Sequence, residues 1–256
     1  MRIPPRRTLS VLAVAATVVL TATSCGGGTS SQHPSADAKT APGAATSPSA
    51  SADPFAGETA NQILTGATAS LASADSVKVA GTMKQSGGEM SIDLYMVKNV
   101  GCQGSIGMGS QGTVTMVALG KTVWEKLDQA TLAGAVGKDE AAALKGKYFK
   151  TTSTAKDFQD LQSFCDLNTF AKGMANGSDD TYSKGAVTST GGQQVLTLVD
   201  TKDHSSVLVS LTAPHRVLRA MGATPADGSI TIGYDLGSKI TPPPASEVVD
   251  ASKYGM

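Results

Sequence analysis

The chain has 256 residues, and its 21 basic and 21 acidic side chains give a formal net charge of +0. This balance, with an aromatic content of only 4%, argues against nucleic-acid binding, which needs a basic surface and aromatic rings for base stacking. About 200 residues follow a low-complexity N-terminal stretch, which is long enough for one domain with a substantial core.

The first 24 residues have the parts of a secretory signal peptide. Arginines at positions 2, 6 and 7 supply a positive start, and an apolar run extends over residues 9–22. This run is shorter than the roughly 20 residues that span a bilayer, which favours a signal core over a permanent helix. Ala22-Thr23-Ser24-Cys25 resembles the bacterial lipobox, in which the cysteine receives a diacylglycerol and becomes the new N-terminus.

We therefore predict a signal peptide at residues 1–24 and a lipid anchor at Cys25, carrying acyl chains such as palmitate. The anchor would hold the chain at the extracytoplasmic face of the cell membrane. An ordinary cleaved signal, in which Cys25 is incidental, is the alternative. Because Arg6 and Arg7 are adjacent, the Sec and twin-arginine export routes both stay open.

Residues 25–54 form the second predicted segment, a flexible tether. After Cys25 it is rich in Gly, Ser, Thr, Ala and Pro and contains no aromatic or large aliphatic residue. Such a segment cannot bury enough apolar surface to fold. The folded domain is predicted to occupy residues 55–256.

Cysteine usage agrees with export. Beyond Cys25 the chain contains only Cys102 and Cys165, and outside the cytoplasm two thiols in one domain favour a disulfide over two buried free thiols. The histidines of the domain, His204 and His215, are far from both cysteines in sequence, and no C-x-x-C spacing is present. We therefore predict a disulfide and no metal site.

Residues 56–74 are predicted to form a helix, since apolar residues recur there at helical spacing. The period then changes to two over residues 77–83 and 90–96, which indicates strands with one apolar face around a hairpin turn at residues 86–88. Alternating apolar patterns predict further strands at 103–108, 113–119, 122–127, 182–189, 193–200, 207–212, 217–221 and 230–234. Helices are predicted between these runs at 128–145, with an interruption at Gly137, and at 157–164 and 167–174.

The tail from Ile240 contains three consecutive prolines and is predicted to be extended. Runs of strands with helices clustered between them indicate an α+β fold. We expect a large curved antiparallel sheet with helices packed on its concave apolar face.

Residues 107–112 match the pattern G-x-G-x-x-G, but a strand is predicted to follow, so a turn is favoured over a nucleotide site. No G-x-S-x-G motif is present, and both histidines lie in predicted loops. We therefore expect no catalytic residue, no cofactor and no enzymatic activity. A hydrolase with scattered catalytic residues is a minor alternative, which a Ser or Asp side chain beside either histidine would support.

Several segments together resemble the LppX/LprG-type (LolA-like) lipoproteins of high-GC Gram-positive bacteria. They are the lipobox and tether, the strand opening Ser76-Val77-Lys78-Val79-Ala80-Gly81, the segment Gly146-Lys147-Tyr148-Phe149, and the closing residues 240–250. The resemblance implies a half-barrel sheet, closed by helices around an apolar cavity that binds or ferries acylated lipids. The implied cavity residues are the inward strand positions Val79, Ile92, Leu94, Met96, Val207, Val209, Ile230 and Ile232.

The leading hypothesis is a membrane-anchored, non-catalytic carrier of an apolar or acylated lipid. Methionines recur on the predicted apolar faces, as suits a surface that must fit varied apolar partners, although plain core packing would also explain them. The alternative is an accessory lipoprotein with a packed core that binds an envelope protein or has a structural or signalling role.

Overall fold

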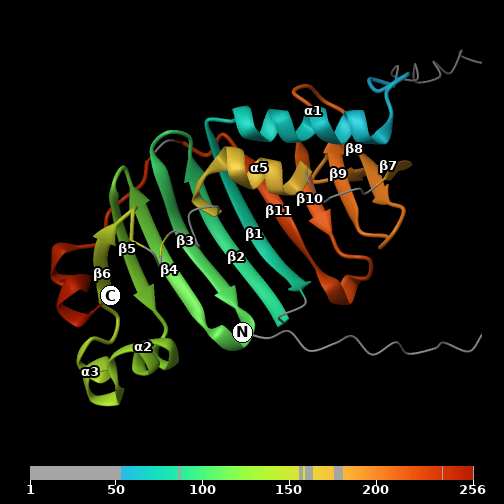
Figure 1. Ribbon diagram of the computed structural model, residues 1–256. Coiled ribbons are helices and arrows are strands. Elements are labelled where there is room, and N and C mark those ends of the chain that lie inside the picture. The colour runs from blue at the N-terminus through green and yellow to red at the C-terminus, as the bar shows by residue number, and fades with distance from the viewer. Residues whose placement is uncertain are drawn as a thin grey trace, which may run out of the picture. The chain divides into compact units, whose positions relative to one another are not determined.

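The computed structural model describes residues 53–85, 88–155, 158, 164–175, 181–237 and 239–255, and the account below concerns these. Their dominant feature is a 12-stranded sheet, with strand order β12-β6-β5-β4-β3-β2-β1-β11-β10-β9-β8-β7 (Figure 1). The strands of the first half are β1 (Ser76–Gln85), β2 (Gly88–Val97), β3 (Gly101–Met108), β4 (Thr113–Leu119), β5 (Thr122–Leu127) and β6 (Tyr148–Thr152). Those of the second half are β7 (Tyr182–Thr190), β8 (Gln193–Asp200), β9 (Ser206–Ser210), β10 (Val217–Met221), β11 (Gly228–Tyr234) and β12 (Val248–Asp250).

Two meanders build this sheet, since β1–β5 and β7–β11 each pair with their neighbours in sequence. The meanders meet where β1 pairs antiparallel with β11. The edge strands of the sheet, β7 and β12, do not pair with each other, so the sheet is open. The prediction of an α+β fold with one large antiparallel sheet and helices on its apolar face is confirmed.

Strict alternation gives the sheet one apolar face, which we call the inner face because α1 (Ala60–Ser73) and α5 (Leu167–Ala175) pack on it. Val77 and Val79 of β1 lie opposite Met96 and Leu94 of β2 on this face. Lys78, between the two valines, points outward, as does Asp93 of β2, and the two form an ion pair with Nζ and Oδ1 3.0 Å apart. The period of two in the sequence therefore reports directly which residues face the helices.

Helix α1 begins four residues later than predicted. Thr59 and Gln62 form a capping box, in which each side chain accepts a hydrogen bond from the other residue's backbone N–H. The cap sets the first helical residue at Ala60, and residues 53–58 form turns. The buried side chains of α1 include Ile63, Leu64, Ala67 and Leu71, which are the periodic positions used in the prediction.

Glycines allow close strand approach within the sheet. Gly104 of β3 has φ +145°, and a Cβ atom there would meet the backbone carbonyl of Asp93 on β2. Gly81 of β1 has φ +151°, and its Cβ would meet the carbonyl of Ser229 on β11. A side chain at either position would push neighbouring backbones apart, which is why a residue without Cβ stands there.

A small second layer lies at one end of the sheet, apart from α1 and α5 (Figure 1). It contains α2 (Gln129–Val136) and α3 (Lys138–Ala143), separated at Gly137 as predicted. The Asp128 carboxylate caps α2 and also accepts a hydrogen bond from the backbone N–H of Thr113, which ties the helix to the start of β4. Leu132, Ala141, Leu144, Phe149 and Ala251 form a separate core here.

The C-terminal segment crosses the outer face of the sheet. Ile240 is buried against Val97 and Val117, and the backbone N–H of Thr241 donates to the side-chain oxygen of Gln103. The segment then forms β12, which pairs in parallel with β6. The tail is thus extended over only part of its length, because short 3₁₀ turns at Ala245–Glu247 and Ala251–Tyr254 flank β12.

Two predicted features fall partly outside the described residues. The hairpin turn at 86–88 includes residues 86 and 87, and the predicted helix at 157–164 includes only Phe158 and Phe164 among the described residues. The signal peptide, Cys25 and the tether to residue 52 also lie outside them. None of the described helices is long and apolar enough to cross a membrane.

Candidate functional site

The residues predicted to line a cavity are brought together on the inner face. Val79, Ile92, Leu94, Met96, Val207, Val209, Ile230 and Ile232 belong to one apolar core, and none is more than 8% exposed. The same core contains Ile63, Ala67 and Leu71 of α1. The part of the inner face where the prediction placed the ligand is therefore packed into the core that the sheet shares with its helices.

Open space is found farther along the inner face, over β5 and β6. A cavity of about 250 Å³, here called the β5–β6 cavity, lies beside the second layer. It is lined by Glu125, Leu127, Ala135, Phe149, Thr151, Ala155, Phe158 and Ala251. Ala135 comes from the alanine-rich segment that follows β5, and its short side chain leaves volume that a larger residue would fill.

A second cavity, of about 270 Å³, opens toward the turns at the sheet rim and is called the rim cavity. Its lining includes the β2–β3 turn, Gly120 of the next turn, and Cys165, Asp166 and Leu167 at the start of α5. Phe158 lines both cavities and is only 2% exposed. One aromatic side chain is thus shared by two cavities of similar size.

Glu125 brings the one charged side chain among the described residues that line the β5–β6 cavity. In the sheet register it lies between Met116 of β4 and Phe149 of β6, which are 0% and 3% exposed. Its Oε1 atom is inaccessible to solvent. The sequence contained this signal, because Glu125 stands at an inward position of the alternating strand Val123-Trp124-Glu125-Lys126-Leu127.

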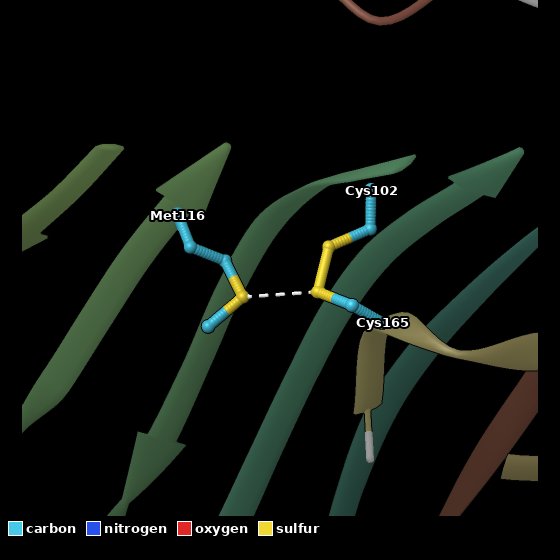
Figure 2. Close-up of a disulfide and its surroundings, with 3 residues drawn as sticks. All are labelled: Cys102, Met116 and Cys165. Atoms are coloured by element: carbon cyan, nitrogen blue, oxygen red, sulfur yellow. Dashed lines mark hydrogen bonds between the residues drawn. A yellow bond between two sulfur atoms is a disulfide. The ribbon is translucent and has the colours of Figure 1, made fainter. Parts of the chain in front are cut away.

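The predicted disulfide between Cys102 and Cys165 is present and links β3 to the segment before α5, with the two Cα atoms 5.3 Å apart (Figure 2). Met116 of β4 packs against it, with its Sδ atom 3.3 Å from Sγ of Cys165 (Figure 2). Asp166 then accepts a hydrogen bond from the backbone N–H of Thr169, which caps the first turn of α5. The disulfide therefore fixes the start of α5 at the wall of the rim cavity.

A third cavity, of about 350 Å³, lies near the β9–β10 loop and differs in chemistry. Ser210, Thr212, Arg216 and Tyr234 contribute to its lining, as does Ile232, one of the predicted cavity residues. The Arg216 guanidinium lies 4.5 Å from the Tyr234 ring centre and forms an ion pair with Asp235 at 2.6 Å. This polar surface offers an acyl chain less apolar contact than the β5–β6 cavity does.

Neither histidine contacts a candidate catalytic side chain through any hydrogen bond found among the described residues. The His215 ring packs on Phe55, with centroids 4.5 Å apart, and its Nδ1 is 3.1 Å from the backbone carbonyl of Ser210. His204 is exposed in a turn with φ +64°. The described residues also contain no group of three or more His, Cys, Asp or Glu side chains that could hold a metal ion. The G-x-G-x-x-G segment leads through a 3₁₀ turn at Gly109–Gln111 into β4, as expected for a connection between strands.

No family model matches the sequence, and no curated protein matches it. Among solved structures, the crystal structure of LprF from Mycobacterium bovis is similar at 10% sequence identity and a TM-score of 0.47, covering 72% of this chain and 96% of that one. A likeness at this level says nothing about function, which must be inferred from the residues of the chain itself.

Proposed function

We propose that this chain is a lipid-anchored extracytoplasmic protein that binds an apolar or acylated lipid on the inner face of its sheet, in the β5–β6 cavity. The observation that carries the proposal is the lining of that cavity, which is aliphatic and aromatic apart from Glu125 and Thr151. Transfer of an acyl chain from water into such a site is favourable by about 0.8 kcal/mol of free energy per buried CH₂ group.

The size of the site supports a ligand that extends past Phe158. Cavities of about 250 and 270 Å³ are each slightly smaller than typical ligand pockets, which measure roughly 300–1,000 Å³. A rotation of the Phe158 ring that joined the two would bring their combined volume into that range. An acyl chain could then lie in the β5–β6 cavity and continue toward the rim, where a headgroup would meet solvent.

The N-terminal sequence supplies the second part of the proposal. Acylation of Cys25 would place the domain at the membrane surface, and residues 25–54 would act as its tether. A lipid-binding domain held in this way would meet membrane lipids without diffusing through the envelope. The chemistry of the site requires binding only, so no catalytic step is part of the proposal.

A second candidate function is favoured by a different observation. The predicted cavity residues of the inner face are nearly fully buried in one core with side chains of α1 and α5. An accessory lipoprotein that recognises an envelope protein would need only this packed core. Occupancy of the β5–β6 cavity decides between the two candidates.

Photo-crosslinking in cells tests the proposal with the full chain. A glycerolipid carrying a diazirine in its acyl chain is supplied to cells that express the protein, and crosslinked peptides are mapped. We expect adducts on β5, β6 and α2. Ala135→Phe should reduce them severalfold because the new ring fills the cavity, whereas Ala130→Phe, on the same helix but outside the cavity lining, should leave them unchanged. Adducts confined to residues outside the cavity, or absent, would favour the accessory role.

A further inference from the structure

The third cavity, beside the β9–β10 loop, differs from the two apolar cavities in size and in charge. Its volume of about 350 Å³ lies within the usual range of ligand pockets, roughly 300–1,000 Å³. Arg216 is the one charged residue in its described lining, to which Gln193 and Thr212 add side chains that can donate hydrogen bonds. A bound acyl chain would desolvate these polar groups without giving them a partner, so the third cavity suits a different kind of ligand.

Two contacts hold the Arg216 guanidinium at the cavity wall. It lies over the Tyr234 ring, and its Nη1 donates a hydrogen bond of 2.6 Å to Oδ2 of Asp235. The ring is itself fixed, because the Tyr234 hydroxyl donates to the backbone carbonyl of Val217 at 2.7 Å. A guanidinium held in this way loses little conformational freedom when a ligand binds, which favours binding.

These contacts leave part of the guanidinium unused. The group has five N–H donors, yet within the described part of the chain only Nη1 has a hydrogen-bond partner, and the buried Nε has none. Asp235 neutralises the charge only in part, since its side chain is 57% exposed and solvent weakens the ion pair. The remaining donors and positive character of Arg216 suit an oxyanion, which arginine binds through paired N–H groups.

The cavity lies beside the place where the described residues begin. His215 directly precedes Arg216, and its ring packs on Phe55 with centroids 4.5 Å apart. If residues 25–54 tether the domain to a membrane through Cys25, phospholipid headgroups supply phosphate groups close to this end of the domain.

We propose that the third cavity binds the phosphate group of a membrane phospholipid, with Arg216 as the main contact and Gln193 and Thr212 as further donors. This lipid is a different molecule from the one proposed for the β5–β6 cavity, and its acyl chains would stay in the membrane. Binding would dock the domain on the surface to which it is tethered. The inference goes beyond the proposed function, and only the choice of a membrane phosphate rests on the anchor proposed at Cys25.

Calorimetric titration of the purified full chain with two soluble phosphates tests the site. Glycerophosphoglycerol is the headgroup of phosphatidylglycerol without its acyl chains, and inorganic phosphate represents a free phosphate. We expect one glycerophosphoglycerol per chain, bound at least tenfold more tightly than inorganic phosphate, because the cavity has room for the glycerol groups as well. Neither probe carries an acyl chain, so the β5–β6 cavity does not contribute to the signal.

Substitutions at the two ends of one ion pair separate binding from structure. Arg216→Gln should weaken the binding of glycerophosphoglycerol at least tenfold because the charge is lost. Asp235→Asn should instead strengthen it severalfold, since a competing carboxylate is removed, and asparagine tolerates the φ of +57° at this position. Arg219→Gln is the matched control and should keep the wild-type affinity, because the Arg219 guanidinium donates to Ser229 and is not part of the lining.

The outcomes separate the parts of the proposal. Wild-type protein that does not bind glycerophosphoglycerol, or binds it no better than Arg216→Gln does, would refute the site. Weaker binding by both Arg216→Gln and Asp235→Asn would show that the ion pair has only a structural role. Inorganic phosphate that binds as tightly as glycerophosphoglycerol would refute the phospholipid assignment. The photo-crosslinking of the β5–β6 cavity is a separate measurement, so failure of the proposed function is distinguishable from failure of this inference.

Discussion

Removal of the disulfide should destabilise the domain strongly. Cys102 and Cys165 are separated by 63 positions, so their link closes a long loop in the unfolded chain. In the chain-entropy account a loop of this length contributes about 4 kcal/mol to the free energy of unfolding. The double substitution Cys102→Ala with Cys165→Ala should therefore lower that free energy by about 4 kcal/mol.

Urea denaturation of the oxidised wild type and the double variant measures this difference, and the thermal midpoint should fall by roughly 8–16 °C for a domain of this size. Reduced wild-type protein is the control and should behave like the variant. The remaining contacts of α5, including buried Leu167 and Ala171, should keep the variant folded in the absence of denaturant. A loss of less than about 1 kcal/mol would show that the unfolded chain gains little freedom without the link, and would refute the reasoning.

Three further predictions concern separate parts of the chain. Cys25→Ser should abolish metabolic labelling by a fatty acid, whereas the double Cys102/Cys165 variant should keep it. Labelling of Cys25→Ser equal to that of the wild type would rule out Cys25 as the anchor. Gly104→Ala should destabilise by more than 1 kcal/mol in denaturant titration, since its Cβ would meet the Asp93 carbonyl, whereas Gly134→Ala on α2, with nothing within 4 Å, should be neutral or stabilising. Hydrogen bonds from Thr131 and Thr113 lower the pKa of Asp128 from its ordinary value of 3.8. The ionised carboxylate therefore stabilises the fold fully above pH 3.8, and this stabilisation is lost as the pH falls through the lowered pKa. Asp128→Asn should flatten the acid dependence of the free energy of unfolding, and an unchanged dependence would contradict the assignment.

Much of the sheet was predictable because its strands have one solvent-exposed face and one face packed against the core. The predicted bounds of β4, β5, β8 and β10 agree with the structure to the residue. The break at Gly137 was also predicted, since glycine with positive φ readily ends a helix. Local signals of this kind depend on neighbouring residues only.

Other features depend on contacts between distant segments. Strand β12 has only three residues and no usable period, and its parallel pairing with β6 results from the path of the tail across the outer face. The start of α1 was predicted too early because the mutual capping of Thr59 and Gln62 outweighs the helical propensity of the residues before it.

The position of the candidate site shows the same limit. Alternation indicates which side chains point inward, but it does not show which stretch of the inner face the helices cover. The structure buries Val79 and Leu94 in the core that α1 and α5 share with the sheet, and leaves space beside Phe149 and Phe158. The clearest sequence signal for that space was an acid at an inward position, Glu125, close to an alanine-rich segment.

The β5–β6 cavity is proposed to hold one lipid, and native mass spectrometry of the purified full chain tests this claim most directly. We predict a non-covalent lipid adduct, at one molecule per chain, in the wild type and in the Ala130→Phe variant. The Ala135→Phe variant should lack it. A wild-type protein without any adduct, or an adduct that Ala135→Phe leaves in place, would contradict the claim.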